Sequence, residues 1–176
     1  VIPAVGFIYG IVRGAYKYRV HNVKVPSSNL PEAFNGFKIV QLSDIHTGSF
    51  MDNHPLNTAF DIVMKQNADL ILFTGDLVNN VASEVQEYIP IFNKLKAPLG
   101  VYSTLGNHDY GDYYRWDSPK AKQQNLNDLK YAHKLLGWDL LNDENRILTE
   151  SGDKLAILGV QNCGFGRFAK QNYGDL

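Results

Sequence analysis

The chain has 176 residues, 44% of them hydrophobic and 20% charged, a composition typical of a soluble globular domain and unlike that of a disordered or fibrous chain. It has 17 basic and 18 acidic residues, so the net charge of −1 gives no reason to expect nucleic acid as a stable partner. The single cysteine, Cys163, excludes an intrachain disulfide and a zinc knuckle.

The N-terminal residues have the composition of a segment that enters or lies at a membrane. Residues 1–12 are uncharged and nearly all apolar, and four basic residues precede the first acid, Glu32: Arg13, Lys17, Arg19 and Lys24. A membrane-spanning helix needs about 20 apolar residues. We therefore expect residues 1–22 to be the end of a membrane anchor, or of a signal segment, followed by a basic linker; a buried amphipathic segment is the third alternative.

The basic flank also bears on location. Such a flank is typical of the cytoplasmic end of a membrane helix, which predicts a membrane-associated domain that faces the cytoplasm. A signal segment would instead place the domain outside. In the anchor interpretation the membrane is a partner through the N-terminal segment, whereas oligomeric state is not predicted.

Three short apolar runs in residues 37–44, 69–76 and 100–109 each end in polar residues, as expected for buried strands that lead to a site at their carboxyl ends. Between them, apolar residues at helical spacing predict helices within 54–67 and 83–97, the latter kinked by Pro90.

A third helix is predicted over residues 119–136, followed by a β-hairpin within 139–162 that turns at Ser151, Gly152 and Asp153. Strands that alternate with helices predict an α/β fold.

Polar residues follow each of the three apolar runs: Asp44 and His46, then Asp76, then Asn107 and His108. Because the carboxyl ends of neighbouring parallel strands meet at one edge of a sheet, these side chains are expected to lie close together. Oxygen and nitrogen donors without a thiolate favour a divalent ion such as Mn, Fe or Zn. The sequence thus predicts a metal site.

The motifs DIH (44–46), GDLVN (75–79) and GNHD (106–109) resemble those of the calcineurin-like metallophosphoesterases. Each motif is weak by itself, but together, in this order and at three successive strand ends, they are specific. The resemblance covers residues 23–176 and implies the N-terminal two-thirds of such a domain. The family's later Gly-His and Gly-His-x-His motifs, which would supply three further histidine ligands, are not among these residues.

The resemblance implies two divalent metal ions. Asp44 and His46 would bind the first ion, Asp76 would bridge both, and Asn107 would bind the second. Family chemistry implies hydrolysis of a phosphate ester by a hydroxide held between the two ions.

The resemblance also implies two catalytic residues. His108 would donate a proton to the leaving oxygen, and Asp109 would hydrogen-bond to that imidazole and orient it.

The implied fold is a four-layer α/β/β/α sandwich, incomplete in this chain. The substrate would be a phosphomonoester or a phosphodiester. Similar membrane-proximal family members are bacterial, so the resemblance implies a protein at the inner or cytoplasmic membrane of a bacterium. They also make a sugar-nucleotide lipid pyrophosphate an alternative substrate. A metal-binding domain without turnover is an alternative of another class.

The remaining candidates have ordinary explanations beside functional ones. His21, His54 and His133 follow no strand, so solvent exposure or helix capping is expected for them rather than metal binding. Asn79 is expected to hold the metal loop by hydrogen bonds.

Four aromatic residues after the proton donor would form either a wall over the substrate or a surface loop: Tyr110, Tyr113, Tyr114 and Trp116. Two arginines, Arg115 and Arg167, would pair either with a second phosphate or with surface acids.

Overall fold

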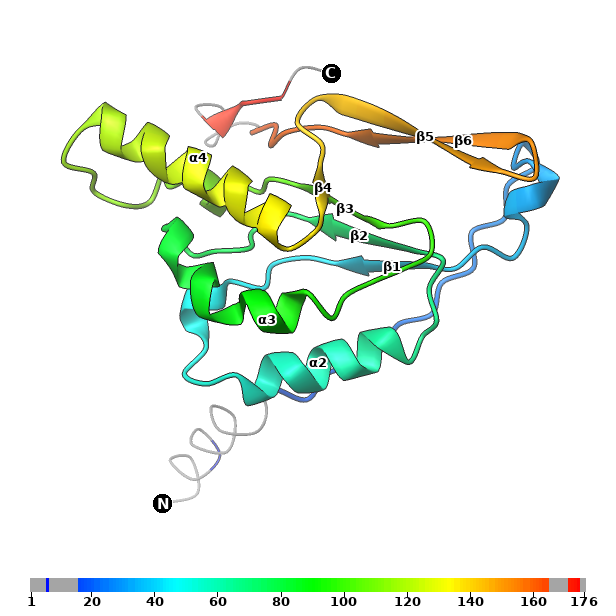
Figure 1. Ribbon diagram of the computed structural model, residues 1–176, viewed down its shortest axis with the longest axis horizontal. Helices are drawn as coiled ribbons and strands as arrows, with labels where there is room; N and C mark the ends of the chain where they lie inside the picture. The colour runs from blue at the N-terminus through cyan, green and yellow to red at the C-terminus, as the bar shows by residue number, and fades with distance from the viewer. Residues whose placement is uncertain (1–5, 7–15, 165–170, 175–176) are drawn as a thin grey trace.

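The computed structural model describes residues 6, 16–164 and 171–174. At its centre is a parallel sheet in which β1 (Ile39–Leu42), β2 (Leu70–Thr74), β3 (Val101–Thr104) and β4 (Asp139–Leu140) lie in chain order (Figure 1). The four carboxyl ends therefore share one edge of the sheet. The three predicted strands are confirmed, and the fold is α/β as predicted.

The strands differ in burial because of their places in the sheet. In β2, a continuous apolar run, Ile71 and Phe73 are each 1% exposed. β1 is one of the two edge strands, and Ile39 is 49% exposed. The expectation that β1 would be buried was wrong, because edge position depends on the order of strands in space.

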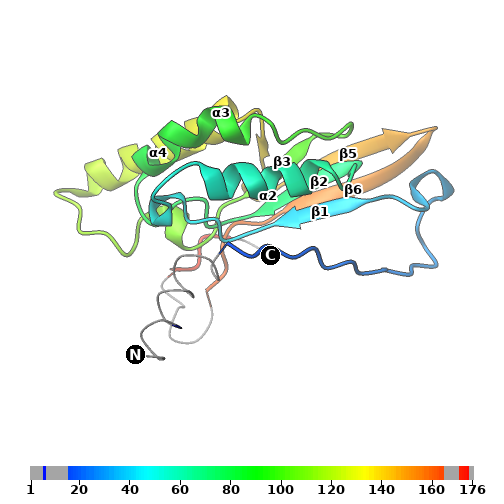
Figure 2. The ribbon, with the colours of Figure 1, turned by 90° about the horizontal axis from the view of Figure 1, so that it is seen from below.

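Three helices cover one face of this sheet: α2 (His54–Met64), α3 (Ile89–Phe92) and α4 (Pro119–Leu135) (Figure 2). In α2, Leu56, Phe60 and Val63 recur at helical spacing and are buried in the core that contains Ile71. The first and third predicted helices are confirmed.

The second predicted helix was only partly right. Residues Ala82–Tyr88 form a 3-10 helix, η4, and only four residues continue as α3. Pro90 lies in the first turn of α3, where its missing N–H is tolerated. Further inside a helix the same residue would remove a hydrogen bond and clash with the preceding turn, so an α-helix cannot run through it unbroken.

The other face of the sheet is covered by the predicted hairpin, in which β5 (Glu144–Glu150) pairs antiparallel with β6 (Asp153–Gly159). Ser151 and Gly152 make the turn with positive φ angles of 49° and 90°. Leu148 packs with Leu70 and Phe34 in a second core. Phe34 belongs to the short 3-10 helix η2 (Glu32–Phe34). The layers are thus helices, a parallel sheet and a second sheet, the first three of the four-layer sandwich that was expected.

The predicted anchor or signal segment lies largely outside the described residues, because residues 1–5 and 7–15 are not among them. Among the described residues, no helix combines the length and apolar character required to cross a bilayer. The Tyr16 ring stacks on Phe50 at 6.1 Å between centroids, which brings the start of the continuous described chain to the loop after β1.

Candidate metal centre

The loops that follow β1 and β2 are held together by backbone hydrogen bonds. The N–H groups of Asp44 and His46 donate to the carbonyls of Gly75 and Asp76, each at 3.0 Å, and Thr47 donates to Leu77 at 2.9 Å. The parallel pairing of the two strands thus continues past their ends and brings both loops to one place.

Three candidate ligands occupy a backbone conformation that costs energy. Asp44, His46 and Asp76 have positive φ angles of 55°, 51° and 58°. For residues other than glycine such conformations cost about 1–3 kcal/mol each and persist where surrounding structure enforces them. Their concentration in the two loops that carry candidate ligands is typical of a functional site.

Two glycines allow the loops after β2 and β3 to touch backbone to backbone. A Cβ on Gly75 would lie 2.3 Å from the Gly106 nitrogen, and one on Gly106 would lie 2.2 Å from Asp76 Oδ1. Neither position has room for a side chain. The glycines of the GDLVN and GNHD motifs are therefore required by packing.

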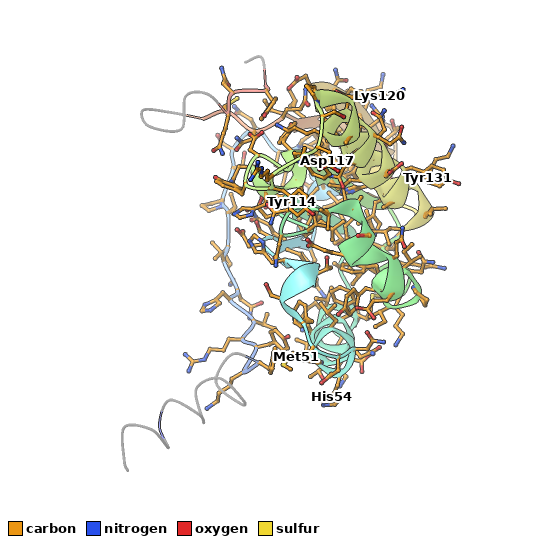
Figure 3. All side chains as sticks on the ribbon, turned by 90° about the vertical axis from the view of Figure 1, so that its left-hand side faces the viewer. Met51, His54, Tyr114, Asp117, Lys120 and Tyr131 are labelled. Carbon is orange, nitrogen blue, oxygen red and sulfur yellow. The ribbon has the colours of Figure 1, made fainter. Side chains whose placement is uncertain are left out.

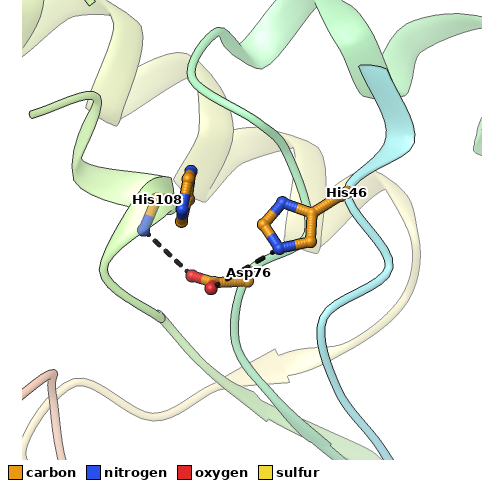
Figure 4. A group of neighbouring side chains, drawn as sticks. All are labelled: His46, Asp76 and His108. Carbon is orange, nitrogen blue, oxygen red and sulfur yellow. Dashed lines mark hydrogen bonds and ion pairs between the residues drawn. The ribbon is translucent and has the colours of Figure 1, made fainter. Parts of the chain in front are cut away.

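The ligand atoms of His46, Asp76 and His108 lie within 4.8 Å of one another (Figure 4). His46 Nε2 is 3.7 Å from Asp76 Oδ2 and 4.0 Å from Asp44 Oδ1. These separations are too long for hydrogen bonds. Two atoms that each bind a metal ion at about 2.1 Å lie at most about 4.2 Å apart, so the separations of His46 from Asp76 and from Asp44 are compatible with a shared divalent ion.

Asp76 lies between the other loops. Its Oδ1 accepts the backbone N–H of His108 at 2.9 Å, while its Oδ2 faces His46. The residue is only 7% exposed, whereas Asp44 is exposed and accepts a hydrogen bond from the Ser43 hydroxyl. The central position of Asp76 is compatible with a bridging carboxylate.

The imidazole of His108 is oriented by a backbone carbonyl. Its Nδ1 lies 2.8 Å from the carbonyl oxygen of Asn79. A carbonyl can only accept, so Nδ1 carries a proton and Nε2 is the atom left for chemistry. The ring meets that of His46 edge to face at 4.7 Å.

The expected role of Asp109 in orienting His108 was wrong. The Asp109 carboxylate is fully buried and accepts four backbone N–H groups, from Asp76 (2.8 Å), Leu77 (2.9 Å), Val78 (3.2 Å) and Gly106 (2.9 Å). These bonds occupy both oxygens. Asp109 instead joins the loop after β2 to the loop after β3.

The surroundings of Asp109 have two opposing effects on the pKa of its carboxyl group. Burial raises the pKa of its carboxyl to about 7, while the hydrogen bonds from Gly106, Val78 and Asp76 oppose that rise. With all four acceptor positions in use, the hydrogen-bond geometry requires the ionised form.

Asn107 lies three residues after the end of β3 and directly precedes the 3-10 helix η5 (His108–Tyr110). Its side-chain Nδ2 donates to the hydroxyl of Tyr113 at 2.8 Å. The structure thus brings loops bearing all the predicted site residues to one edge of the sheet.

Glu84 supports the site and was missed from the sequence. Its carboxylate accepts the backbone N–H groups of Asn79 (2.6 Å), Val81 (3.1 Å) and Asn80 (3.2 Å). A glutamate at the third residue of a helical segment, as Glu84 is in η4, is the signal that could have indicated this cap. The Asn79 side chain bonds Ser49 at 3.2 Å, which confirms its predicted loop-holding hydrogen bonds.

The other histidines differ in burial. His21 and His54 are exposed, as expected. His133 is fully buried, and its Nδ1 lies 2.9 Å from the Ser103 hydroxyl, so the expectation of exposure or capping was wrong there. The reason is that His133 lies on the face of α4 that packs on the sheet.

The aromatic residues after His108 do not act as one wall. Tyr110 is buried and stacks on Tyr173 at 3.7 Å, while the Trp116 indole donates to the Gly111 carbonyl at 2.8 Å. Tyr113 and Tyr114 are about half exposed. Figure 3 looks at this end of the molecule, where Tyr114 lies on the same side as Met51 and His54. Arg115 is exposed, and Arg167 lies outside the described residues.

Comparison with known proteins agrees with this geometry. Residues 37–169 match the model of the calcineurin-like phosphoesterase family. Because the match covers most of the chain, the chain belongs to the calcineurin-like phosphoesterase family, which confirms the resemblance of the three motifs.

Several relatives are similar over roughly half or more of the chain. A transmembrane protein with a metallophosphoesterase domain from Danio rerio is 36% identical over 110 residues, 62% of this chain and 25% of that protein. The uncharacterized metallophosphoesterase YkuE of Bacillus subtilis is 37% identical over 109 residues, 60% of this chain and 38% of that protein. The UDP-2,3-diacylglucosamine pyrophosphatase LpxG of Chlamydia trachomatis is 37% identical over 93 residues, 51% of this chain and 28% of that protein. The similarity thus spans 25 to 38% of the length of these relatives.

Proposed function

We propose that the protein is a metal-dependent hydrolase of phosphate esters, and that residues 23–176 are the N-terminal two-thirds of its catalytic domain. The observation that carries the proposal is the convergence of His46, Asp76 and His108 within 4.8 Å at the carboxyl ends of three successive parallel strands. Family membership supports the same class of reaction.

The metal ligands in this proposal are Asp44 and His46 for a first ion, Asp76 between two ions, and Asn107 for the second. Support comes from the donor set of carboxylate, imidazole and amide oxygen, which suits Mn, Fe or Zn. The bound divalent ions would supply Lewis-acid activation of water and of the phosphate group. The chain's own contribution is to hold Asp76 rigidly between the two flanking loops through the His108 N–H at 2.9 Å.

His108 is the proposed proton donor to the leaving oxygen. Its Nδ1–H is committed to the Asn79 carbonyl at 2.8 Å, which fixes the ring and leaves Nε2 for proton transfer. His108 itself also belongs to the group of three side chains that could hold a metal ion. A variant of His108 must therefore be tested for metal content as well as for rate.

The substrate is proposed to be a phosphomonoester or phosphodiester. The 37% identity to a UDP-2,3-diacylglucosamine pyrophosphatase over 93 residues favours a sugar-nucleotide lipid pyrophosphate as the second candidate. A relative described as a transmembrane protein, together with the apolar and basic residues 1–24, supports association with a membrane, proposed to be the cytoplasmic face of a bacterial inner membrane.

The test is manganese-dependent hydrolysis of bis-p-nitrophenyl phosphate and p-nitrophenyl phosphate by the full-length protein. Asp76→Ala should lose metal and activity together. His108→Ala should keep its metal and lose rate by about 100- to 10,000-fold, the usual contribution of a general acid. His54→Ala, which removes an exposed histidine at the same end of the molecule, is the matched control and should behave as wild type.

Two results would contradict parts of this proposal. Loss of metal in His108→Ala would make His108 a ligand instead of a proton donor. Wild type that binds metal but cleaves neither ester requires a screen of nucleotide-sugar lipids. Absence of turnover there as well would favour a metal-binding domain without catalysis.

A further inference from the structure

Tyr113 links Asn107 to the C-terminal part of the chain through a directional hydrogen-bond chain. Its hydroxyl donates to Gln171 Oε1 at 3.2 Å and accepts from Asn107 Nδ2 at 2.8 Å. A phenol has one O–H proton, and here that O–H donates its hydrogen bond to Gln171. The oxygen of Tyr113 can then only accept, so it selects the NH₂ group of the Asn107 amide.

This selection matters because the two ends of an amide have opposite polarity. If the side-chain amide of Asn107 were flipped by 180°, its NH₂ group, and not its carbonyl oxygen, would face a cation. An NH₂ group offers no lone pair to a metal. The bond to Tyr113 commits the NH₂ group elsewhere and leaves the carbonyl oxygen for a cation. The Tyr113 ring also packs beside the His108 imidazole, with centroids 4.5 Å apart and a 34° tilt.

We infer that Tyr113 is a positioning residue: it sets the amide of Asn107 so that its oxygen is presented to the second metal ion. The inference rests on the proposed function, because it takes Asn107 as a metal ligand. Outer partners that orient ligand side chains typically change metal affinity by about 10- to 100-fold when removed.

The chain contains a matched control in the next residue. Tyr113 and Tyr114 are 49% and 51% exposed. The Tyr114 ring contacts Trp116 at 4.7 Å, and among the described residues neither a side-chain hydrogen bond nor a ring contact joins Tyr114 to the predicted ligands. Removing either hydroxyl changes the surface equally, but only one of them bonds to Asn107.

The experiment is manganese binding to the full-length protein, followed by titration calorimetry and by electron paramagnetic resonance of the bound ion. The variants are Tyr113→Phe, Tyr114→Phe, Asn107→Asp and the double variant Asn107→Asp with Tyr113→Phe. We expect Tyr113→Phe to lower the manganese affinity of the weaker of the two sites about tenfold, with an unchanged melting temperature. Tyr114→Phe should bind manganese as wild type does.

The Asn107→Asp background separates orientation from general structural support. A carboxylate presents oxygen to the ion whichever way it turns, so adding Tyr113→Phe there should leave manganese affinity unchanged. An equal loss in both backgrounds, or equal affinities of Tyr113→Phe and Tyr114→Phe, would overturn the inference while the phosphoesterase proposal stands. A wild-type protein that binds no manganese and lacks activity would overturn both the inference about Tyr113 and the phosphoesterase proposal.

Discussion

At the scale of single residues, the candidate site depends on groups that hold loops in place as much as on groups that face the substrate. Asp109 is the main example, because one buried carboxylate accepts N–H groups from both the loop that carries Asp76 and the loop that carries Asn107. Its effect on catalysis would be exerted through loop geometry, since the His108 ring is held by Asn79.

We therefore expect Asp109→Asn to destabilise the protein by about 3 kcal/mol or more, because an amide offers one acceptor oxygen to four N–H donors and places its own NH₂ group against two of them. Bound manganese should fall at the same time. Urea unfolding and metal analysis measure both effects. Asp117→Asn, on the exposed loop before α4, is the control and should change neither. A variant of Asp109 with wild-type stability that lost only rate would restore the original orienting role.

At the scale of elements, α4 shows how local sequence sets a helix and how packing then uses it. Ser118 caps the helix by accepting the Ala121 N–H at 3.1 Å, and Pro119 occupies the first turn. Asn125, on the buried face, accepts the Ala82 N–H at 2.8 Å and so joins α4 to η4. The helix therefore supports the chain that follows the GDLVN loop.

Removing the cap should weaken this support modestly. Ser118→Ala is expected to lower the free energy of unfolding by about 1 kcal/mol, while Ser118→Asp, which can cap in the same way, should stay near wild type. Chemical denaturation of the two variants measures the difference. Equal stabilities of alanine and aspartate variants would show that the cap contributes nothing measurable.

At the scale of the whole molecule, His133 connects the helical layer to the central sheet. It is fully buried, bonds Ser103 of β3 at 2.9 Å, and packs beside Phe73 and Trp138. Its Nε2 has no hydrogen-bond partner among the described residues. Burial lowers the pKa of His133 to about 3, so the folded protein holds this ring neutral.

The sign of the resulting pH dependence follows from the unfolded state. The unfolded histidine has a pKa of about 6.5 and takes up a proton below it, while the folded one does not. Stability from this group is complete above about pH 6.5 and falls by about 1.4 kcal/mol per unit as the pH drops toward the folded value. His133→Gln should remove that slope from the urea-unfolding free energy between pH 6.5 and 4.5.

The difference between wild type and variant isolates His133, because other titrating groups such as Asp109 contribute equally to both. His54→Gln, which changes an exposed histidine, should keep the wild-type slope. If His133→Gln also keeps the wild-type slope, His133 contributes nothing to the pH dependence, which would mean that the buried ring takes up a proton in the folded state as it does in the unfolded one.

The sequence by itself determined the order of strands and helices around the site. It also determined which residues at the strand ends are the candidate metal ligands. Alternating apolar runs and helix-spaced residues reflect local backbone preference and burial, and the predictions for β2, β3, α2 and α4 were confirmed. The three motifs identified the family because glycine, aspartate and histidine stand where tight loops at strand ends need them.

Only the tertiary structure decided which polar groups far apart in the sequence bond to one another. Asp109 and Asp76 are 33 positions apart, and Tyr113 and Gln171 are 58 apart, so no local pattern could show that they bond. The edge position of β1, the burial of His133 and the role of Asp109 depend on how segments distant in sequence pack against one another. A hydrogen bond is selected by proximity in space, and proximity in space is a property of the assembled fold.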